Sequence, residues 1–268
     1  MNKQNLITKS KLIRRLCLER ISNVKASHVG SNLSIIDILT YLYYEKMDFT
    51  KDTLEKLQRD RFILSKGHAA VALYAILFDK GIISLEEFNS YHVNGSYLTA
   101  QVSSKVKGVD ASVGSLGHGL AIAAGIAWAY KIDDIDKKVY CMLGDGECNE
   151  GTIWETLVFI GTHKLENLII MIDANKWQAY SDTCDSIFKQ TVFINMLKAT
   201  GLNFYECDGH DFDQIHQVFE QPPATKTATI LFFHTIKGKG VSYMENKFEW
   251  HYKSPSAEQL KQALIELA

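Results

Sequence analysis

Two short apolar runs separated by a helical segment constrain the fold of this chain most strongly. Residues 139–143 and 168–172 contain no charged side chain, which is typical of buried strands in a parallel sheet. Between them, the apolar residues of segment 153–161 recur at helical spacing. A strand, a helix and a second strand in this order predict a β-α-β unit with parallel strands. We therefore expect an α/β fold with a central, mainly parallel sheet and helices on both faces.

Polar residues follow both runs, where each predicted strand ends. Segment 144–147 (Gly-Asp-Gly-Glu) follows the first run, and segment 173–175 (Asp-Ala-Asn) follows the second. Open α/β sheets bind ligands at the carboxyl ends of their strands. A Mg²⁺ ion takes oxygen ligands, few of them from protein, and completes its octahedron with phosphate oxygens and water. The Asp145 carboxylate, the Asn175 side-chain oxygen and the Trp177 carbonyl fit this ligand set, so the sequence predicts a metal-bound diphosphate.

The two glycines beside Asp145 support the same interpretation. Gly144 and Gly146 let the backbone turn sharply and approach a phosphate closely. The N–H of Gly146 and the N-terminus of the helix that follows offer partial positive charge to a diphosphate. A Gly-Asp-Gly sequence also occurs in plain β-to-α turns, so the rest of the chain has to decide between the two interpretations.

Further segments carry motifs in the order of one protein family. They are 27–31 (Ser-His-Val-Gly-Ser), 64–69 (Leu-Ser-Lys-Gly-His-Ala), 114–119 (Gly-Ser-Leu-Gly-His-Gly), 144–151 (Gly-Asp-Gly-Glu-Cys-Asn-Glu-Gly), 235–240 (Thr-Ile-Lys-Gly-Lys-Gly) and 250–251 (Trp-His). Together with Asn175, they resemble the diphosphate-binding half of the transketolase family, over roughly residues 10 to 255. The resemblance implies the thiamine-diphosphate-binding fold, with thiamine diphosphate and Mg²⁺ (or Ca²⁺ or Mn²⁺) as cofactors. It also implies transfer of a two-carbon ketol unit from a ketose donor to an aldose or modified-sugar acceptor.

The resemblance implies roles for individual residues as well. His28 and His68 match positions that contact the donor substrate or the cofactor diphosphate. His251 matches the histidine of a Trp-His pair, although Tyr252 stands where glycine is usual. The residues expected to bind the cofactor are His68, Gly114, Ser115, Leu116, His118, Gly144, Asp145, Gly146, Glu147 and Asn175. For His118 an alternative stays open, namely that it packs at the start of a helix.

Four other positions are open to more than one interpretation. Glu150 either caps the following helix or, as the resemblance implies, belongs to a carboxylate relay between two active sites. Lys237 and Lys239 lie in a Gly-Lys-Gly loop and are interpreted as exposed charges without a fixed partner, although they could approach an anionic substrate. Gln101 aligns with a family histidine that touches the sugar, and an amide cannot transfer a proton at neutral pH. The sequence therefore predicts an altered choice of sugar. The remaining histidines are predicted to be structural or solvated: His92, His163, His210 and His216.

The extent of the resemblance bears on domain organisation. Transketolases have a diphosphate domain, a pyrimidine domain and a third domain, and this sequence matches the first alone. We expect residues 1–268 to form one diphosphate-binding domain, with the pyrimidine-binding and C-terminal domains absent. The glutamate that activates the cofactor lies in the family's second domain, so the resemblance implies an α2β2 assembly with a separate C-terminal subunit. The alternatives are an α-type subunit of an acyl transferase or 2-oxo-acid dehydrogenase, a non-catalytic cofactor-binding module, or a truncated chain.

Charge and cysteine content indicate the surroundings of the protein. The chain has 29 basic and 31 acidic residues, which does not favour a nucleic-acid or membrane-surface partner. No apolar run reaches the ~18 residues of a membrane helix. Five cysteines without a Cys-x-x-Cys pair favour a reducing compartment, so we expect a cytoplasmic protein.

Apolar periodicity predicts several helices. The pattern places one helix over about residues 8–23 and a second over about 34–44, and a third follows His68. The segment 120–130 is rich in Ala and Gly, which predicts a fully buried helix packed closely against the sheet or a partner. Segment 256–259 is predicted to begin a final helix. Segments 203–207 and 229–234 are predicted to add two strands to the parallel sheet.

Overall fold

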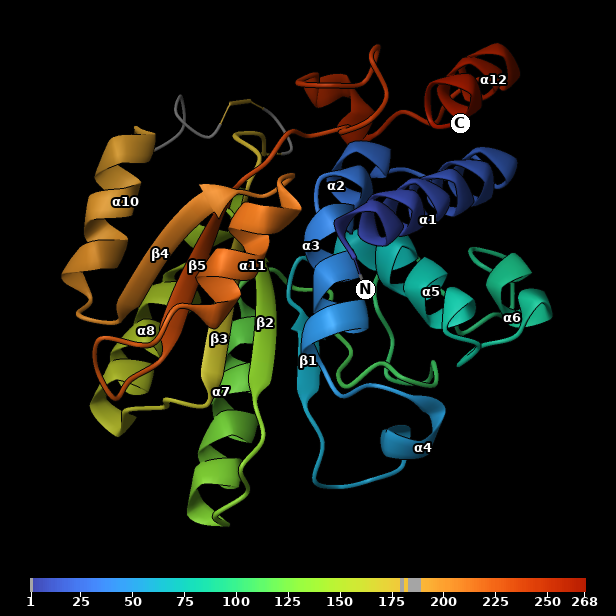
Figure 1. Cartoon of the computed structure of the whole chain (residues 1–268). Helices are drawn as coiled ribbons and strands as arrows, with labels where there is room; N and C mark the ends of the chain where they lie inside the picture. The colour runs from blue at the N-terminus through green and yellow to red at the C-terminus, as the bar shows by residue number, and fades with distance from the viewer. Residues whose placement is uncertain (1, 179–180, 183–188) are drawn as a thin grey trace.

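A parallel sheet of five strands forms the centre of the computed structural model, which describes residues 2–178, 181–182 and 189–268 (Figure 1). The strands are β1 (Arg61–Leu64), β2 (Val139–Gly144), β3 (Leu168–Ala174), β4 (Asn203–Asp208) and β5 (Thr229–His234). They are ordered β1-β2-β3-β5-β4, and every neighbouring pair is parallel. The carboxyl ends of all five strands therefore lie at the same edge of the sheet.

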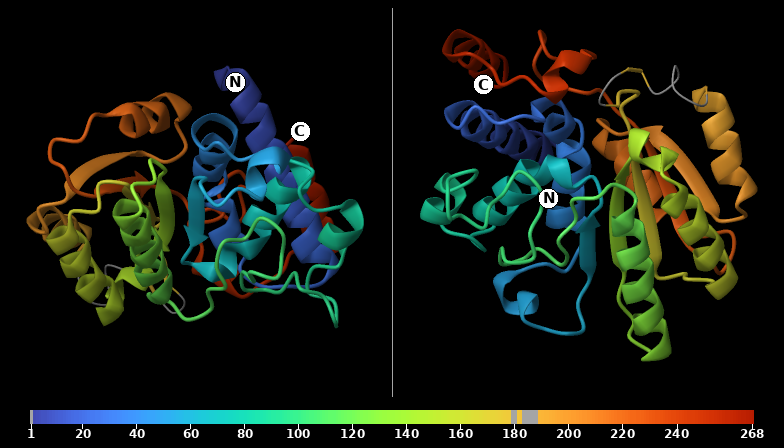
Figure 2. Two further views of the ribbon diagram at one scale, coloured as in Figure 1. Left: turned by 90° about the horizontal axis from the view of Figure 1, so that it is seen from below. Right: turned by 180° about the vertical axis from the view of Figure 1, so that it is seen from behind.

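Helices cover both faces of this sheet, as the sequence predicts. The longer ones are α1 (Lys3–Asn23), α5 (Ala70–Asp79), α7 (His118–Ile132), α8 (Gly151–His163), α10 (Gln190–Ala199), α11 (Phe212–Glu220) and α12 (Ala257–Glu266). The shorter ones are α2 (Val29–Leu33), α3 (Ile36–Tyr41), α4 (Lys51–Leu54), α6 (Leu85–Asn89), the π-helix η1 (Leu42–Lys46) and the 3-10 helices η2 (Gly67–Ala69), η3 (Gly146–Asn149) and η4 (Phe248–His251). Helices α7 and α8 lie on one face and α11 on the other, as the view along the sheet shows (Figure 2).

The strand predictions are confirmed for the central strands. Every residue of β2 is buried, because a parallel strand covered by helices on both faces has no solvent side. The one described strand that the sequence analysis missed is β1. It is four residues long and begins with Arg61, so it shows neither a long apolar run nor alternation.

Two helix predictions need correction. Helix α1 begins at Lys3, because Asn2 caps it by accepting a hydrogen bond from the Asn5 N–H at 2.9 Å. The helix predicted over about 34–44 is divided, since the chain there forms α3 and then the π-helix η1. Helix α7 packs against the sheet, while its Ile122, Trp128 and Ile132 are exposed, so burial of these residues against a partner stays a prediction.

The C-terminal segment crosses the edge of the sheet where the strands end (Figure 1). Here η4 meets the start of α2, and the His28 N–H donates to the His251 carbonyl at 2.7 Å. Helix α12 follows, and Ser256 forms a capping box with Gln259, as predicted for the final helix. None of the helices in the described parts of the chain combines the length and apolar character that crossing a membrane requires.

Candidate functional site

A cavity of about 430 Å³ opens at the edge of the sheet where the parallel strands end. Its walls come from the ends of β2 and β3, the loop after β1, segment 114–116 and η4. The predicted site residues that line it are His28, His68, Gly114, Leu116, Gly144, Asp145, Gly146, Glu147, Glu150, Asn175, Trp177 and His251. The fold thus brings together residues that are more than two hundred positions apart in the chain, such as His28 and His251.

Ser115 and His118 are the two predicted site residues that are not part of the cavity wall. Both are exposed. His118 is the first residue of α7, and its Nδ1 lies 3.3 Å from the Leu116 carbonyl. The alternative interpretation of His118, a residue at the start of a helix, therefore fits the structure better.

Asp145 lies directly after β2 with its carboxylate buried. Its Oδ1 accepts a hydrogen bond from the Gly146 N–H at 2.8 Å, and its Oδ2 accepts one from the Lys176 N–H at 2.7 Å. Burial and the nearby Asp173 carboxylate raise the pKa of Asp145 to about 7. The two backbone donors therefore do not offset the burial of this negative charge, whereas a bound divalent cation would offset it.

Asn175 follows β3 and has its amide fixed by two hydrogen bonds. The Asn175 Nδ2 donates to Asp173 at 2.8 Å, and the Asn175 Oδ1 accepts from the Trp177 N–H at 3.0 Å. The described residues contain no group of three or more His, Cys, Asp or Glu side chains arranged to hold a metal. A cation bound by Asp145 and Asn175 would therefore need further oxygen ligands from phosphate and water. Mg²⁺ is usually coordinated in this way in proteins. The donor set fits such an ion, and the Trp177 carbonyl as a third ligand stays a prediction.

An ion pair below the cavity, between Lys66 and Asp173, was missed in the sequence analysis. The Lys66 ammonium also donates to the Ser31 carbonyl at 3.1 Å, and Asp173 accepts hydrogen bonds from Ser34 at 2.7 Å and from Thr235. Burial by itself raises the pKa of Asp173, but Lys66 overcomes this effect and keeps the pKa below its usual value. Asp173 thereby orients both Lys66 and Asn175. The available signal was the position of Lys66 inside the motif at 64–69.

The sequence analysis interpreted Lys237 as an exposed charge without a fixed partner, and this interpretation is wrong. Its side chain is fully buried, and its Nζ lies 3.0 Å from Nδ1 of His251. A Cβ on Gly30 would lie 2.9 Å from Lys237 Cγ, so glycine is required for this close approach. Burial and the neighbouring Lys66 lower the pKa of Lys237 to about 8. Lys239 is paired too, with its Nζ 3.7 Å from Glu245.

Three histidine rings meet on one side of the cavity. The ring centroid of His28 lies 5.1 Å from that of His68 and 4.9 Å from that of His251. Burial, followed by the charge of Lys237, lowers the pKa of His28 to about 4 and that of His251 to about 3. Burial and Lys66 also hold the pKa of His68 well below its usual value. The imidazoles are therefore neutral at pH 7 and can hydrogen-bond a sugar hydroxyl, while the lysines carry the positive charge.

Glu147 lines the cavity, but its carboxylate is engaged by protein donors. Oε1 accepts from the Ser65 hydroxyl and from the Gly117 N–H at 2.9 Å, and Oε2 accepts from the Gly144 N–H at 3.1 Å. Burial raises the pKa of Glu147. Its carboxylate therefore holds the glycine-rich loop against the end of β2, and a direct contact between this carboxylate and a cofactor has no support here.

Glu150 precedes α8 at the mouth of the cavity. It occupies the N-cap position, but its side chain makes no capping hydrogen bond, so that interpretation is wrong. The residue is exposed. Its carboxylate is therefore available to a partner, and the relay role stays a prediction.

Two polar side chains mark the outer wall of the cavity. Gln101 lines it, and its contact with a sugar stays a prediction. Tyr252 is 58% exposed, and its ring centroid lies 4.7 Å from that of His251 and 6.0 Å from that of His28. An aromatic ring at this place narrows the approach to the histidines.

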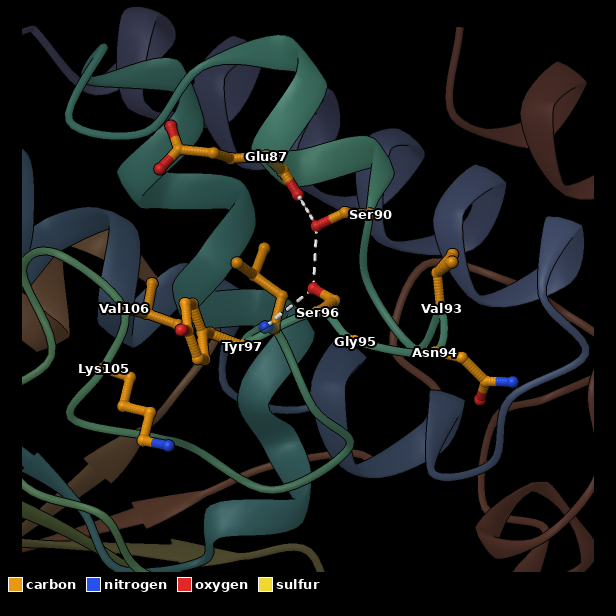
Figure 3. A pocket seen from close by; sticks show the side chains of 10 residues that line it. Glu87, Ser90, Val93, Asn94, Gly95, Ser96, Tyr97, Lys105 and Val106 are labelled. Carbon is orange, nitrogen blue, oxygen red and sulfur yellow. Dashed lines mark hydrogen bonds between the residues drawn. The ribbon is translucent and has the colours of Figure 1, made fainter.

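A second hollow, of about 370 Å³, lies beside α6 and is less suited to chemistry (Figure 3). Its polar groups bind one another: the Ser90 hydroxyl donates to the Glu87 carbonyl at 2.7 Å and lies 2.7 Å from the Ser96 hydroxyl. The Lys105 ammonium lies over the Tyr97 ring, 5.2 Å from its centroid. Because these groups do not converge on the hollow as free donors, the candidate site is the cavity at the strand ends.

Comparison with known proteins gives a consistent family match. The family model for the transketolase thiamine diphosphate binding domain matches residues 5–267. An apulose-4-phosphate transketolase subunit of Phocaeicola vulgatus is 37% identical over 269 residues, which cover 100% of this chain and 95% of that protein. A 6-deoxy-6-sulfo-D-fructose transketolase subunit of Clostridium sp. is 36% identical over 258 residues, covering 96% of this chain and 94% of that protein.

Solved structures agree with this match. The transketolase of Campylobacter jejuni superimposes with a TM-score of 0.92 at 28% identity over 100% of this chain. That superposition covers 43% of the Campylobacter protein, so this chain spans less than half the length of the solved transketolase.

Proposed function

Because this chain belongs to the transketolase family, as its thiamine diphosphate binding domain, we propose that it is the diphosphate-binding subunit of a two-component transketolase. The proposed reaction moves a two-carbon ketol unit from a ketose donor to an aldose or modified-sugar acceptor. The relatives that match it almost end to end are named as transketolase subunits, which supports this assignment.

The residues of the cavity have distinct tasks in this proposal. Asp145 and Asn175 hold a Mg²⁺ ion, and Lys66 in the cavity wall supplies positive charge near the diphosphate. Lys237 adds positive charge from its buried position beside His251. When bound, thiamine diphosphate supplies the carbanion chemistry of ketol transfer. The neutral rings of His28, His68 and His251 orient sugar hydroxyls and exchange protons with them.

A second subunit is required, because this chain is proposed to be a single diphosphate-binding domain. The partner would carry the pyrimidine-binding domain and the glutamate that activates the cofactor, in an assembly with two copies of each chain. The exposed Glu150 at the cavity mouth is suited to contact that partner. Three relatives are named as subunits of transketolases, which supports a separate partner chain.

The substrate class follows from the outer wall of the cavity. A wall with Gln101 and Tyr252 holds a polar group by hydrogen bonds and does not offer the imidazole expected at that place. We propose a modified ketose as donor, in preference to the common pentose phosphates. Two relatives are named for such sugars, apulose 4-phosphate and 6-deoxy-6-sulfofructose.

The proposed location is the cytoplasm. The described cysteines are free thiols, namely Cys17, Cys141, Cys148 and Cys207, and this suits a reducing compartment. Cys184 lies outside the described residues.

The observation that carries this proposal is the meeting of Asp145 and Asn175, from neighbouring strands, with three neutral imidazoles in one cavity. The test is to co-express the chain with a pyrimidine-domain partner and to purify the pair. The pair is then assayed with ketose donors, namely xylulose 5-phosphate, apulose 4-phosphate and 6-deoxy-6-sulfofructose, and with 2-oxo acids. Ketol transfer from a ketose supports the proposal. Turnover of 2-oxo acids alone would favour a dehydrogenase-type subunit, and cofactor binding without any turnover would favour a non-catalytic module.

A further inference from the structure

Three buried residues far from the cavity mouth form a hydrogen-bonded cluster that holds the backbone of the loop carrying Lys237. We propose that Arg14, Asp37 and His210 form a clamp that positions the Lys237 ammonium for the diphosphate of the cofactor. Arg14 lies on α1, Asp37 on α3 and His210 in the turn after β4. The inference rests on the proposed function, because it concerns how the same site holds its cofactor.

The clamp has a buried, fully bonded centre. The Arg14 guanidinium donates to both oxygens of Asp37, at 2.8 and 2.6 Å, and His210 Nδ1 lies 2.7 Å from Oδ2 of Asp37. The side chains of all three residues are less than one-tenth exposed. Burial by itself raises the pKa of Asp37, but Arg14 and His210 overcome this effect and hold the pKa far below its usual value. Asp37 is therefore charged at neutral pH and fixes both partners.

Each partner of Asp37 then holds the backbone on one side of Lys237. His210 Nε2 accepts a hydrogen bond from the Ile236 N–H at 2.9 Å. The Nε of Arg14 donates to the Lys239 carbonyl at 3.1 Å. The loop is thus tied immediately before and two residues after Lys237. Two helices and a turn contribute side chains to these contacts. An ion pair with a purely local role would not need to reach the backbone of this loop.

The position of the Lys237 side chain depends on these two hydrogen bonds to the loop backbone. Its side chain passes against Gly30 and ends 3.0 Å from His251, with no exposed surface. If the loop shifts, this path is lost, and the ammonium no longer lies beside His251 of the cavity wall, the place from which it is proposed to attract the diphosphate. Arg14, Asp37 and His210 do not touch the cavity, so they are positioning residues.

The two hydrogen bonds of His210 can be tested separately with two matched substitutions of this residue. One neutral tautomer alone fits both contacts, with the proton on Nδ1 for Asp37 and a free Nε2 for Ile236. The amide of glutamine reaches the place of Nε2, and the amide of asparagine reaches the place of Nδ1. His210→Gln therefore keeps the acceptor for Ile236, and His210→Asn keeps only the link to Asp37.

The experiment measures thiamine diphosphate affinity by calorimetric titration of the full chain in saturating Mg²⁺. We expect His210→Asn to weaken binding by about tenfold, as the loss of a supporting contact does in other sites. We expect His210→Gln to stay within about twofold of the wild type. Unfolding in urea is followed in parallel, so that a loss of stability is recorded separately.

A double-mutant cycle with Lys237→Met decides whether the clamp acts through Lys237. In the Lys237→Met background, His210→Asn should cause no further loss of affinity. An equal loss in both backgrounds would overturn the inference, as would an unchanged affinity of His210→Asn with lowered stability. Asp110→Asn is the control: it disrupts another buried ion pair, with Arg59, and should lower stability without changing affinity. If neither the wild-type chain nor its pair with the partner subunit binds the cofactor, the proposed function fails, and the inference fails with it.

Discussion

The floor and the rim of the cavity are built on different physical principles. The floor consists of Lys66, Asp145 and Asn175 in the cavity wall, together with Asp173 and Lys237, which are buried behind that wall; all five are at most 8% exposed. Their charges are matched by ion pairs, by backbone donors or by the proposed cation. The rim consists of Gln101, Leu116, Glu150 and Tyr252, which are partly or largely exposed. Buried charge tolerates few substitutions, because any unpaired group costs several kcal/mol, on the order of 3–5.

This difference assigns the two parts of the reaction to two parts of the site. In the proposed function, the floor holds a metal and a diphosphate, which the cofactor chemistry needs. The rim is proposed to face substrate and partner, where exposed side chains change at little cost in stability. The departures from the family pattern at Gln101 and Tyr252 both lie on the rim, so we expect this chain to differ from other transketolases in its sugar and to agree with them in its cofactor site.

The largest effect should come from the floor, at the proposed metal ligand. Asp145→Ala removes a charged ligand and leaves the diphosphate charge uncompensated, so we expect thiamine diphosphate affinity to fall at least about 100-fold. Calorimetric titration with Mg²⁺ measures it, and excess chelator should reproduce the effect in the wild type. Undiminished binding in both cases would rule out the metal assignment.

A matched pair of glutamates tests the boundary between floor and rim. The buried Glu147 accepts three hydrogen bonds, and Glu147→Gln turns an acceptor into a donor that faces backbone N–H groups. We expect a loss of about 1–3 kcal/mol in the free energy of unfolding. Glu150→Gln, at an exposed carboxylate, should change it by less than about 0.5 kcal/mol. Urea denaturation compares the two, and equal losses would contradict the division.

The pH dependence of cofactor binding tests the charge of the floor. Burial and Lys66 lower the pKa of Lys237 to about 8, so the ammonium loses its proton as the pH rises past that value. We expect thiamine diphosphate affinity to rise with pH until the Asp145 carboxyl has lost its proton near pH 7, and to fall above about pH 8 by up to about tenfold per pH unit. Lys237→Met has no charge to lose, and its weaker affinity should stay flat above about pH 8.

The lowered pKa of Lys237 has the opposite consequence for the stability of the cofactor-free chain, which should rise with pH where cofactor affinity falls. Between the folded value of about 8 and the usual value of 10.5, the unfolded chain binds more protons at Lys237. The contribution of this residue to stability therefore rises with pH in that window. Urea denaturation of the wild type and of Lys237→Met at pH 8 and 10 isolates this contribution. If the free energy of unfolding of the wild type minus that of the variant fell between pH 8 and 10, the lowered pKa of Lys237 would be contradicted.

The smallest effect on cofactor binding should come from the rim. Gln101→His and Tyr252→Gly restore the family residues at exposed places, so thiamine diphosphate affinity should stay within about twofold and stability within about 0.5 kcal/mol. With the partner subunit present, the kcat/KM values for xylulose 5-phosphate relative to apulose 4-phosphate should rise. An unchanged donor profile would show that neither residue selects the sugar.

Much of the fold could be predicted because its signals are local. The apolar runs that became β2 and β3 need no knowledge of distant residues, and Asp145 and Asn175 follow them directly. The edge strand β1 and the division of the helix near residue 42 could not be predicted, since four residues carry no period and packing decides where a helix changes its pitch. The composition of helix α7 predicts burial against the sheet or a partner, but small apolar residues do not say which side of a helix meets the sheet.

The sequence by itself determined the family, the fold class and the two polar residues at the ends of neighbouring strands, because motif order and strand periodicity are written along the chain. The tertiary structure alone decided the role of Lys237, which looks like a loop charge in sequence and is a buried ammonium beside His251 in space. It also decided that Glu147 holds the loop at Gly117, that Glu150 leaves its helix uncapped, and that Arg14, Asp37 and His210 meet at all. The physical reason is that burial and charge pairing depend on which segments pack together, and no local pattern records contacts across 173 or 225 residues of chain.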